Sequence, residues 1–148
     1  MFDKIVYLGA DHGGYLLKEG IQNYLKQSKI EVVDLGTYDE ESVDYPEIAR
    51  EVAEKVIENE GSLGILVCGT GIGMSMTANK VAGIRAAVCT DEFTAGATRK
   101  HNNANVMCLG GRVTDPDLSY KMVDIFLGTD FEGGRHERRV GKIENPEK

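Results

Sequence analysis

The segment LGILVCGTGIGMSM (63–76) places a cysteine where an apolar run breaks into a glycine-rich turn. Glycines follow Cys68 at alternate positions: Gly69, Gly71 and Gly73. Backbone N–H groups exposed by such a turn can bind an anion, or an oxygen that becomes negative during a reaction. A helix start after the turn also favours the thiolate form of Cys68, and the Thr70 hydroxyl is close enough in sequence to share a proton with the sulfur. The residues alone leave open an ordinary strand-to-helix turn with a buried, inert cysteine.

The same turn is a poor match to nucleotide-binding motifs. The GxGxxG pattern needs glycine at position 74, where this chain has Met74, and the first turn, GADHGG (9–14), also fails the pattern. Asp34, at the end of a predicted strand, is by itself weak support for a ribose-binding acid. A GxxxxGK[ST] motif is absent from the sequence, which excludes a P-loop.

Two polar residues, Asp11 and His12, follow the first apolar run. A carboxylate and an imidazole at this place can orient a sugar hydroxyl or hold a phosphate. The alternative is that Asp11 caps the following helix and His12 is a solvated loop residue. The residues do not decide between these two interpretations.

The basic segment RHERRVGK (135–142) offers a second candidate for anion binding. Arg135 and Arg139 are four residues apart and share one face if the segment is helical, so their guanidinium groups can clamp a phosphate. A basic last helix that complements its own dipole is the alternative. His101 lies in a turn before the last predicted strand, at the opposite edge of the sheet, so its use in a site would require a neighbouring chain.

Composition limits the classes of protein that fit. With 148 residues, 41% hydrophobic and 28% charged, the chain has the size and balance of one globular domain, predicted over residues 1–148. A net charge of −7 disfavours broad nucleic-acid binding, and the sequence predicts neither a membrane span nor a signal peptide, so we expect a cytoplasmic protein. The cysteines are odd in number and lack CxxC spacing, which predicts reduced thiols and no metal: Cys68, Cys89 and Cys108.

Five β-like runs must position these residues. They are residues 4–10, 31–36, 63–68, 84–89 and 105–110, and their nearly continuous apolar character is typical of strands covered on both faces. Helical periodicity separates them, as in Ile48, Val52 and Val56, and Asp44 with Pro46 marks a helix start. Further helices are predicted over 115–127 and after Gly133. The pattern predicts an α/β three-layer sandwich on a five-stranded parallel sheet, with a C-terminal helical extension and ligands at the carboxyl ends of the strands.

Five segments together, GADHGGY, DYPEIA, CGTGIGMSMTANKVAGIRAAVC, RKHNNANVMCLGGR and EGGRHERRV, resemble the ribose-5-phosphate isomerase B family. That family stands in a wider group that includes galactose-6-phosphate isomerase subunits. The resemblance covers almost the whole chain and implies a Rossmann-like or flavodoxin-like fold. It also implies metal-independent, cofactor-free interconversion of ribose 5-phosphate and ribulose 5-phosphate in the pentose phosphate pathway. Active sites would be shared across a homodimer or homotetramer interface.

The resemblance also implies a role for each site residue. Cys68 would move a proton between C1 and C2 through an enediolate, assisted by Thr70, while His101 would open the ring that Asp11 positions. Loop amides would stabilise the enediolate: those of Gly69, Gly71, Ile72 and Gly73. The residues implied for phosphate binding are His12, Arg112, Arg135 and Arg139. Tyr45 and Asn102 would line the sugar pocket.

Some relatives in this group use a glutamate after the glycine loop as the base instead of the cysteine. Here that position is Met74, which cannot accept a proton, so the resemblance places the chain with the cysteine type. Two other functions remain open from the sequence. One is a hexose-6-phosphate isomerase acting on allose or galactose 6-phosphate, and the other is a non-catalytic module that binds a sugar phosphate or a nucleotide.

Overall fold

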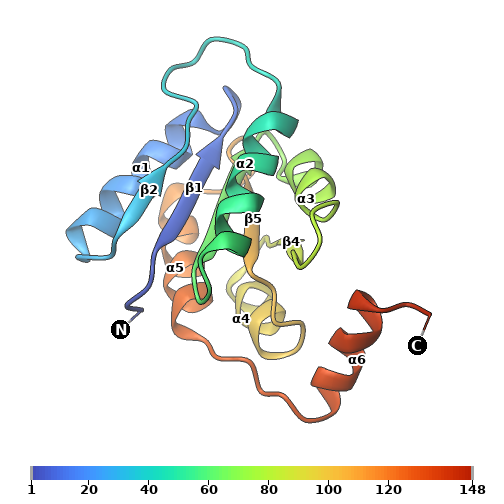
Figure 1. Cartoon of the computed structure of the whole chain (residues 1–148). Helices are drawn as coiled ribbons and strands as arrows, with labels where there is room; N and C mark the ends of the chain where they lie inside the picture. The colour runs from blue at the N-terminus through green and yellow to red at the C-terminus, as the bar shows by residue number, and fades with distance from the viewer. Residues whose placement is uncertain (1, 148) are drawn as a thin grey trace.

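The computed structural model describes residues 2–147 and contains a five-stranded parallel sheet (Figure 1). The strands are β1 (Val6–Ala10), β2 (Val32–Asp34), β3 (Leu63–Cys68), β4 (Ala86–Val88) and β5 (Val106–Gly110). Their order across the sheet is β2-β1-β3-β5-β4. The central strand β3 lies between β1 and β5 and is parallel to both, so the carboxyl ends of these three strands lie side by side.

Six helices accompany the sheet in the described part of the chain. They are α1 (Tyr15–Gln27), α2 (Tyr45–Glu58), α3 (Ile72–Ala78), α4 (Glu92–Lys100), α5 (Pro116–Gly128) and α6 (Arg135–Glu144). One apolar cluster joins α1, α4 and α5 to one face of the sheet, and a second joins α2 and α3 to the other face. This arrangement confirms the predicted α/β sandwich with a parallel sheet, and α6 is the predicted C-terminal extension.

Alternating side chains of the buried strands explain the two clusters. In β3, Ile65 and Val67 face the α1 side, whereas Leu66 and Cys68 face the α2 side, and all four are at most 6% exposed. A strand buried on both faces needs apolar residues at every position, which is why the sequence shows continuous runs.

Local signals in the sequence fix where several helices begin. Asp91 accepts a hydrogen bond from the Thr94 amide at 2.7 Å and forms a capping box at the start of α4. Pro46 and Pro116 lie in the first turns of α2 and α5. Gly133 and Gly134 both have positive φ, as the predicted hinge before α6 requires.

The predicted strands over 31–36 and 84–89 are shorter in the structure, where they span only Val32–Asp34 and Ala86–Val88. Both are edge strands, which pair on one side only, so regular hydrogen bonding ends sooner than the apolar pattern suggests. Within residues 2–147 every helix is too short or too polar to cross a membrane. The extent of the domain and the cytoplasmic location stay predictions.

Candidate active site

The carboxyl ends of β1, β3 and β5 are joined by backbone hydrogen bonds. The Gly111 amide donates to the Cys68 carbonyl at 2.7 Å, and the Arg112 amide donates to the Gly69 carbonyl at 3.1 Å. On the other side, the Asp11 amide donates to the Val67 carbonyl at 3.2 Å. These bonds hold the three loops that carry the candidate residues against one another.

Cys68 is the last residue of β3 and is 6% exposed. Its Sγ accepts a hydrogen bond from the Gly71 amide at 3.1 Å. Gly71 has a φ of +85°, which lets the chain turn sharply enough to aim its N–H back at the sulfur. This hydrogen bond holds the Cys68 sulfur at the start of the glycine loop.

Thr70 is exposed, and its Oγ1 accepts a hydrogen bond from the Ile72 amide at 3.2 Å. Among residues 2–147 the structure gives no hydrogen bond between this hydroxyl and Cys68. Two loop amides are thus already committed, Gly71 to the sulfur and Ile72 to Thr70. Ile72 itself is 50% exposed beside the turn.

The Arg112 guanidinium lies close to two backbone segments. A Cβ atom placed on Gly69 would lie 3.2 Å from Arg112 Nη1, and one placed on Gly13 would lie 3.4 Å from Arg112 Cζ. Because glycine has no side chain, Gly13 and Gly69 let the guanidinium lie close to the loops that follow β1 and β3. Arg112 therefore places a positive charge next to the Cys68 loop, where it can bind an anion.

Asp11 and His12 are both tied to the backbone around them. Asp11 is 7% exposed, and its Oδ1 accepts hydrogen bonds from the Gly13 and Gly14 amides at 2.9 and 3.1 Å. His12 Nδ1 accepts a hydrogen bond from the Val43 amide at 3.2 Å. A neutral His12 then carries its proton on Nε2, which is a hydrogen-bond donor. Asp11 thus organises the turn before α1, and His12 fixes the long loop before α2.

Tyr45 begins α2 and lies against the glycine loop. A Cβ on Gly73 would lie 2.5 Å from Cε1 of the Tyr45 ring, so only glycine leaves room for the ring there. Tyr45 remains 37% exposed, at the edge of the same strand-end site. The residues that the structure brings together here are Asp11, His12, Tyr45, Cys68, Gly69, Thr70, Gly71, Ile72, Gly73 and Arg112.

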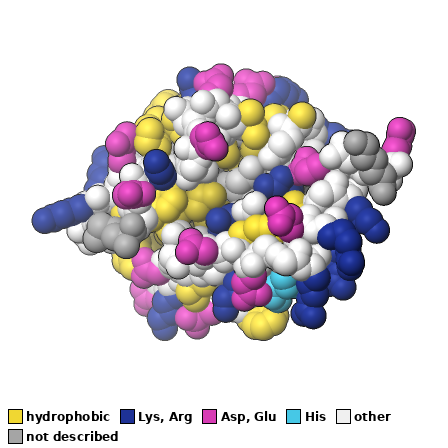
Figure 2. Space-filling view, turned by 60° about the horizontal axis from the view of Figure 1, so that its bottom comes forward, with side chains coloured by type: hydrophobic (Ala, Val, Ile, Leu, Met, Phe, Trp, Pro, Cys, Tyr) yellow, Lys and Arg dark blue, Asp and Glu magenta, His cyan; other side chains and the backbone are white. Residues whose placement is uncertain are grey.

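The remaining candidates lie at the other end of the strands. His101 is the C-cap of α4, which runs back toward the amino ends of the strands, and Asn102 follows it. Arg135 and Arg139 are exposed on α6, at the bottom right of Figure 1. When this end is turned forward, Lys and Arg side chains gather at one side next to a histidine (Figure 2). Within one chain, these four residues do not meet Cys68.

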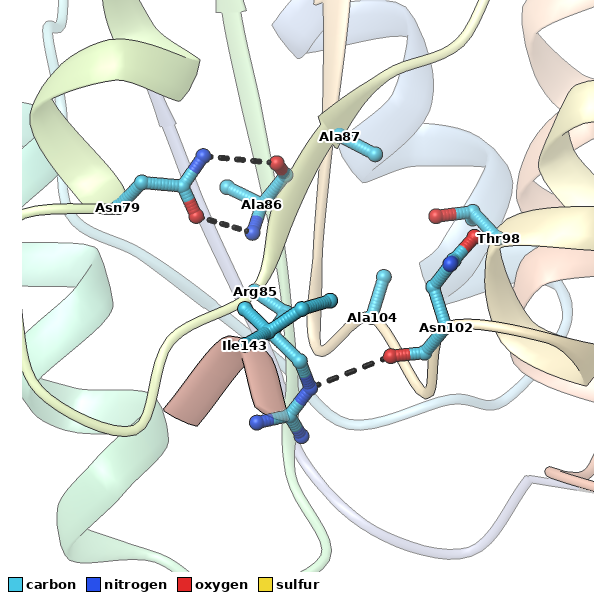
Figure 3. A pocket seen from close by; sticks show the side chains of 8 residues that line it. All are labelled: Asn79, Arg85, Ala86, Ala87, Thr98, Asn102, Ala104 and Ile143. Carbon is cyan, nitrogen blue, oxygen red and sulfur yellow. Dashed lines mark hydrogen bonds between the residues drawn. The ribbon is translucent and has the colours of Figure 1, made fainter. Parts of the chain in front are cut away.

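Asn102 lies by a cavity of about 330 Å³ at the β4 edge (Figure 3). The Arg85 Nε donates to the Asn102 carbonyl at 3.2 Å, and Ile143 of α6 covers the same cavity. The Asn79 amide group bonds both the N–H and the C=O of Ala86, so it satisfies part of the exposed β4 edge.

Two residues that the sequence did not single out accompany His101. The rings of His101 and His136 stack with centroids 4.4 Å apart and 19° between their planes. Glu132 Oε1 lies 4.0 Å from His101 Nε2 and 3.8 Å from His136 Nε2. Glu132 and His136 are four residues apart across the Gly133–Gly134 hinge, a spacing that could have drawn attention to the pair.

The pKa of His136 is lowered from its ordinary value. Burial of the ring is the largest cause, and the neighbouring His101 and Arg135 act in the same direction, while Glu132 opposes them. His136 is therefore neutral near pH 7, and the stacked pair does not carry two charges.

The other two cysteines and Met74 belong to the core. Cys89 and Cys108 are 1% and 0% exposed; burial raises the pKa of Cys89 to about 11 and also raises the pKa of Cys108. Met74 is fully buried and packs in the same cluster as Cys68. A carboxylate at position 74 would need a different local packing.

Comparison with known proteins agrees with this arrangement. The sequence model of the ribose/galactose isomerase family matches residues 6–143. Ribose-5-phosphate isomerase B of Escherichia coli is 46% identical over 140 residues, which cover 95% of this chain and 94% of that protein.

Two solved structures show the same fold over nearly their whole length. Ribose-5-phosphate isomerase B of Clostridium thermocellum has a TM-score of 0.92 and 50% identity, with 97% of each chain covered. The enzyme of Mycoplasma genitalium, solved with bound ribulose-5-phosphate, has a TM-score of 0.92 and 47% identity, with 97% of this chain and 95% of that chain covered. This chain belongs to the ribose/galactose isomerase family.

Proposed function

We propose that this protein interconverts D-ribose 5-phosphate and D-ribulose 5-phosphate, with Cys68 as the base and without a metal. The observation that carries the proposal is the placement of Cys68 Sγ at the end of β3, hydrogen-bonded to the Gly71 amide. The relative of Mycoplasma genitalium that binds ribulose-5-phosphate has the same fold, which supports the choice of sugar.

The thiolate of Cys68 removes the C2 proton of the open-chain aldose, and the C1 carbonyl oxygen takes up the negative charge. The resulting thiol returns the proton to C1, while the O2 proton moves to O1, and the ketose forms. Cys68 thus carries a proton and forms no covalent bond with the sugar. Thr70, next to the sulfur in the loop, assists the proton transfer between the oxygens.

Amides of the glycine loop stabilise the enediolate. Because Gly71 and Ile72 already donate to Sγ and to Thr70 Oγ1, the N–H groups of Gly69, Thr70 and Gly73 serve the substrate oxygens. Donors that are held in place before the reaction lower its activation free energy by several kcal/mol, roughly 3 kcal/mol for one well-placed donor. Arg112, held against Gly69, adds a positive charge.

A second copy of the chain completes the site. His101, Asn102, Arg135 and Arg139 lie at the opposite end of the sheet from Cys68, so in a homodimer they serve the partner's strand-end site. His101 opens the furanose ring, and Arg135 and Arg139 join His12 and Arg112 on the phosphate. Asp11 and Tyr45 line the sugar. A homotetramer would pair two such dimers.

The test is an isomerase assay in the presence of a metal chelator with ribose 5-phosphate, allose 6-phosphate and galactose 6-phosphate. We expect the highest kcat/KM with ribose 5-phosphate and a loss of about 10³-fold in kcat for Cys68→Ala, with binding of the sugar phosphate largely kept. Cys89→Ala is the matched control, since it removes a thiol in the core. Full turnover by Cys68→Ala would refute the assignment of the base, and a preference for either hexose phosphate would refute the substrate.

A further inference from the structure

His101, Glu132 and His136 present three metal-ligand atoms at one point of the surface. The ligand atoms of these side chains all lie within 4.8 Å of one another. Two imidazole nitrogens and one carboxylate oxygen form a donor set that Zn²⁺ and neighbouring transition metals bind, with the remaining positions open to water.

The separations are close to those of a filled site. Around a tetrahedral Zn²⁺ with bonds of 2.0–2.1 Å, ligand atoms lie roughly 3.3 Å apart. The Glu132 oxygen is 4.0 Å from His101 Nε2 and 3.8 Å from His136 Nε2, so a shift of less than about 1 Å brings either contact to that value. The side chains of Glu132 and His101 are 54% and 44% exposed and can turn, whereas that of His136 is 11% exposed and held in place.

The charges around the three side chains also bear on the binding of a cation. Glu132 contributes a negative charge within 4.0 Å of the Nε2 atoms of both rings. Arg135 and Arg139 on α6 oppose a cation, which points to a reversible site rather than to a permanent structural one.

We propose that His101, Glu132 and His136 form a binding site for a divalent late transition-metal ion, Zn²⁺ foremost, and that the bound ion inhibits the enzyme. The ion takes the Nε2 lone pair of His101, and this nitrogen can then neither accept nor return a proton. Binding stands on the geometry of the three side chains. Inhibition rests on the proposed role of His101 in ring opening.

Binding is tested on the metal-free protein, without substrate, by titration calorimetry with Zn²⁺ and by the visible absorption of added Co²⁺. We expect one ion per chain, and at least tenfold weaker binding in Glu132→Gln and in His136→Gln. Glu137→Gln is the matched control, because it removes the same charge from an exposed position in the first turn of α6. Cys68→Ala tests the competing thiol, and we expect it to bind Zn²⁺ as the wild type does.

Unchanged affinity in Glu132→Gln and His136→Gln, or loss of binding in Cys68→Ala, would overturn the proposed site. Glu132 is exposed, so its replacement tests the site without disturbing the fold. These measurements need no isomerase activity and stay informative if the proposed function fails.

Inhibition is tested by turnover of ribose 5-phosphate at rising Zn²⁺. We expect the inhibition constant to rise in Glu132→Gln by the same factor as the dissociation constant, and to be unchanged in Glu137→Gln. Zn²⁺ that binds to the three ligands without slowing turnover would overturn the inhibitory part of the proposal.

Discussion

The ring of Tyr45 occupies the space that a side chain at Gly73 would need, with a Cβ at that position only 2.5 Å from the ring. This contact joins the start of α2 to the start of α3 and sets one wall of the strand-end site. The glycine at position 73 therefore serves the placement of the tyrosine.

Gly73→Ala is expected to push the Tyr45 ring out of position and to weaken the sugar pocket. We expect KM for ribose 5-phosphate to rise about tenfold, which corresponds to about 1.4 kcal/mol of lost binding, while kcat changes less. Steady-state kinetics measure this split. Gly141→Ala is the control, since a Cβ there would meet nothing within 4 Å and both constants should remain those of the wild type. Unchanged KM in Gly73→Ala would show that the ring does not form part of the pocket.

The three cysteines are expected to react with iodoacetamide at very different rates. Burial holds the pKa of Cys89 at about 11 and raises that of Cys108, so at pH 8 only about one Cys89 side chain in a thousand is a thiolate. Cys68 is at the end of its strand with an amide donor on its sulfur, and it should be alkylated at least tenfold faster than the others. Peptide mass spectrometry over time measures each site in the native protein.

Loss of isomerase activity should follow the labelling of Cys68 and should be slowed by ribose 5-phosphate. Activity that survives complete labelling of Cys68 would contradict its role as the base. Early labelling of Cys89 or Cys108 would show that the core opens more readily than its packing indicates.

A buried cation of the fold is expected to matter for stability. Lys18 is fully buried in α1, and its Nζ lies 2.9 and 2.7 Å from the two carboxylate oxygens of Asp34 at the end of β2. Removal of the carboxylate leaves the ammonium group with the Glu19 carboxylate at 3.2 Å, which is partly exposed. Asp34→Asn should therefore lower the free energy of unfolding by about 2–3 kcal/mol, somewhat less than for a pair with no second partner.

Urea unfolding of Asp34→Asn, Lys18→Met and the double variant measures this pair. The double variant should lose less stability than the sum of the single ones, because neither charge is left alone. Asp39→Asn in the exposed loop is the control and should stay within about 0.5 kcal/mol of the wild type. Additive losses in the double variant would show that Lys18 and Asp34 act independently.

Periodicity and composition in the sequence were enough to predict the layers of the fold but not the pairing of its residues. Apolar runs such as 63–68 predict buried parallel strands because a strand covered on both faces has no polar position. The carboxyl-end rule brought Asp11, Cys68 and Arg112 to one edge, as the structure shows. The order of β4 and β5, and the lengths of the edge strands, depend on long-range pairing that no local pattern records.

The residues that contact His101 were also not predictable from local sequence patterns. Glu132 and His136 reach it only because the chain turns at Gly133 and Gly134 and brings α6 back beside the end of α4. The pair of glycines in the sequence indicates a turn, but it does not indicate the direction in which the chain turns. The partner of the Thr70 hydroxyl was not predictable either: its oxygen accepts a hydrogen bond from the Ile72 amide.

The proposal that each site is shared between two chains makes a quantitative prediction for mixed dimers. If every site of a homodimer uses Cys68 of one chain and His101 of the other, Cys68→Ala and His101→Gln each damage both sites. In a mixed dimer, one site contains both substitutions, and the other site contains neither and is therefore intact. Equal mixing makes about half of the dimers mixed, and each has one working site of two, which restores about a quarter of the wild-type activity.

The two variants are unfolded together, refolded and assayed, with each variant refolded alone as the control. Refolded mixtures no more active than the sum of the separate variants would show that Cys68 and His101 serve the same chain, or that they do not share a site at all.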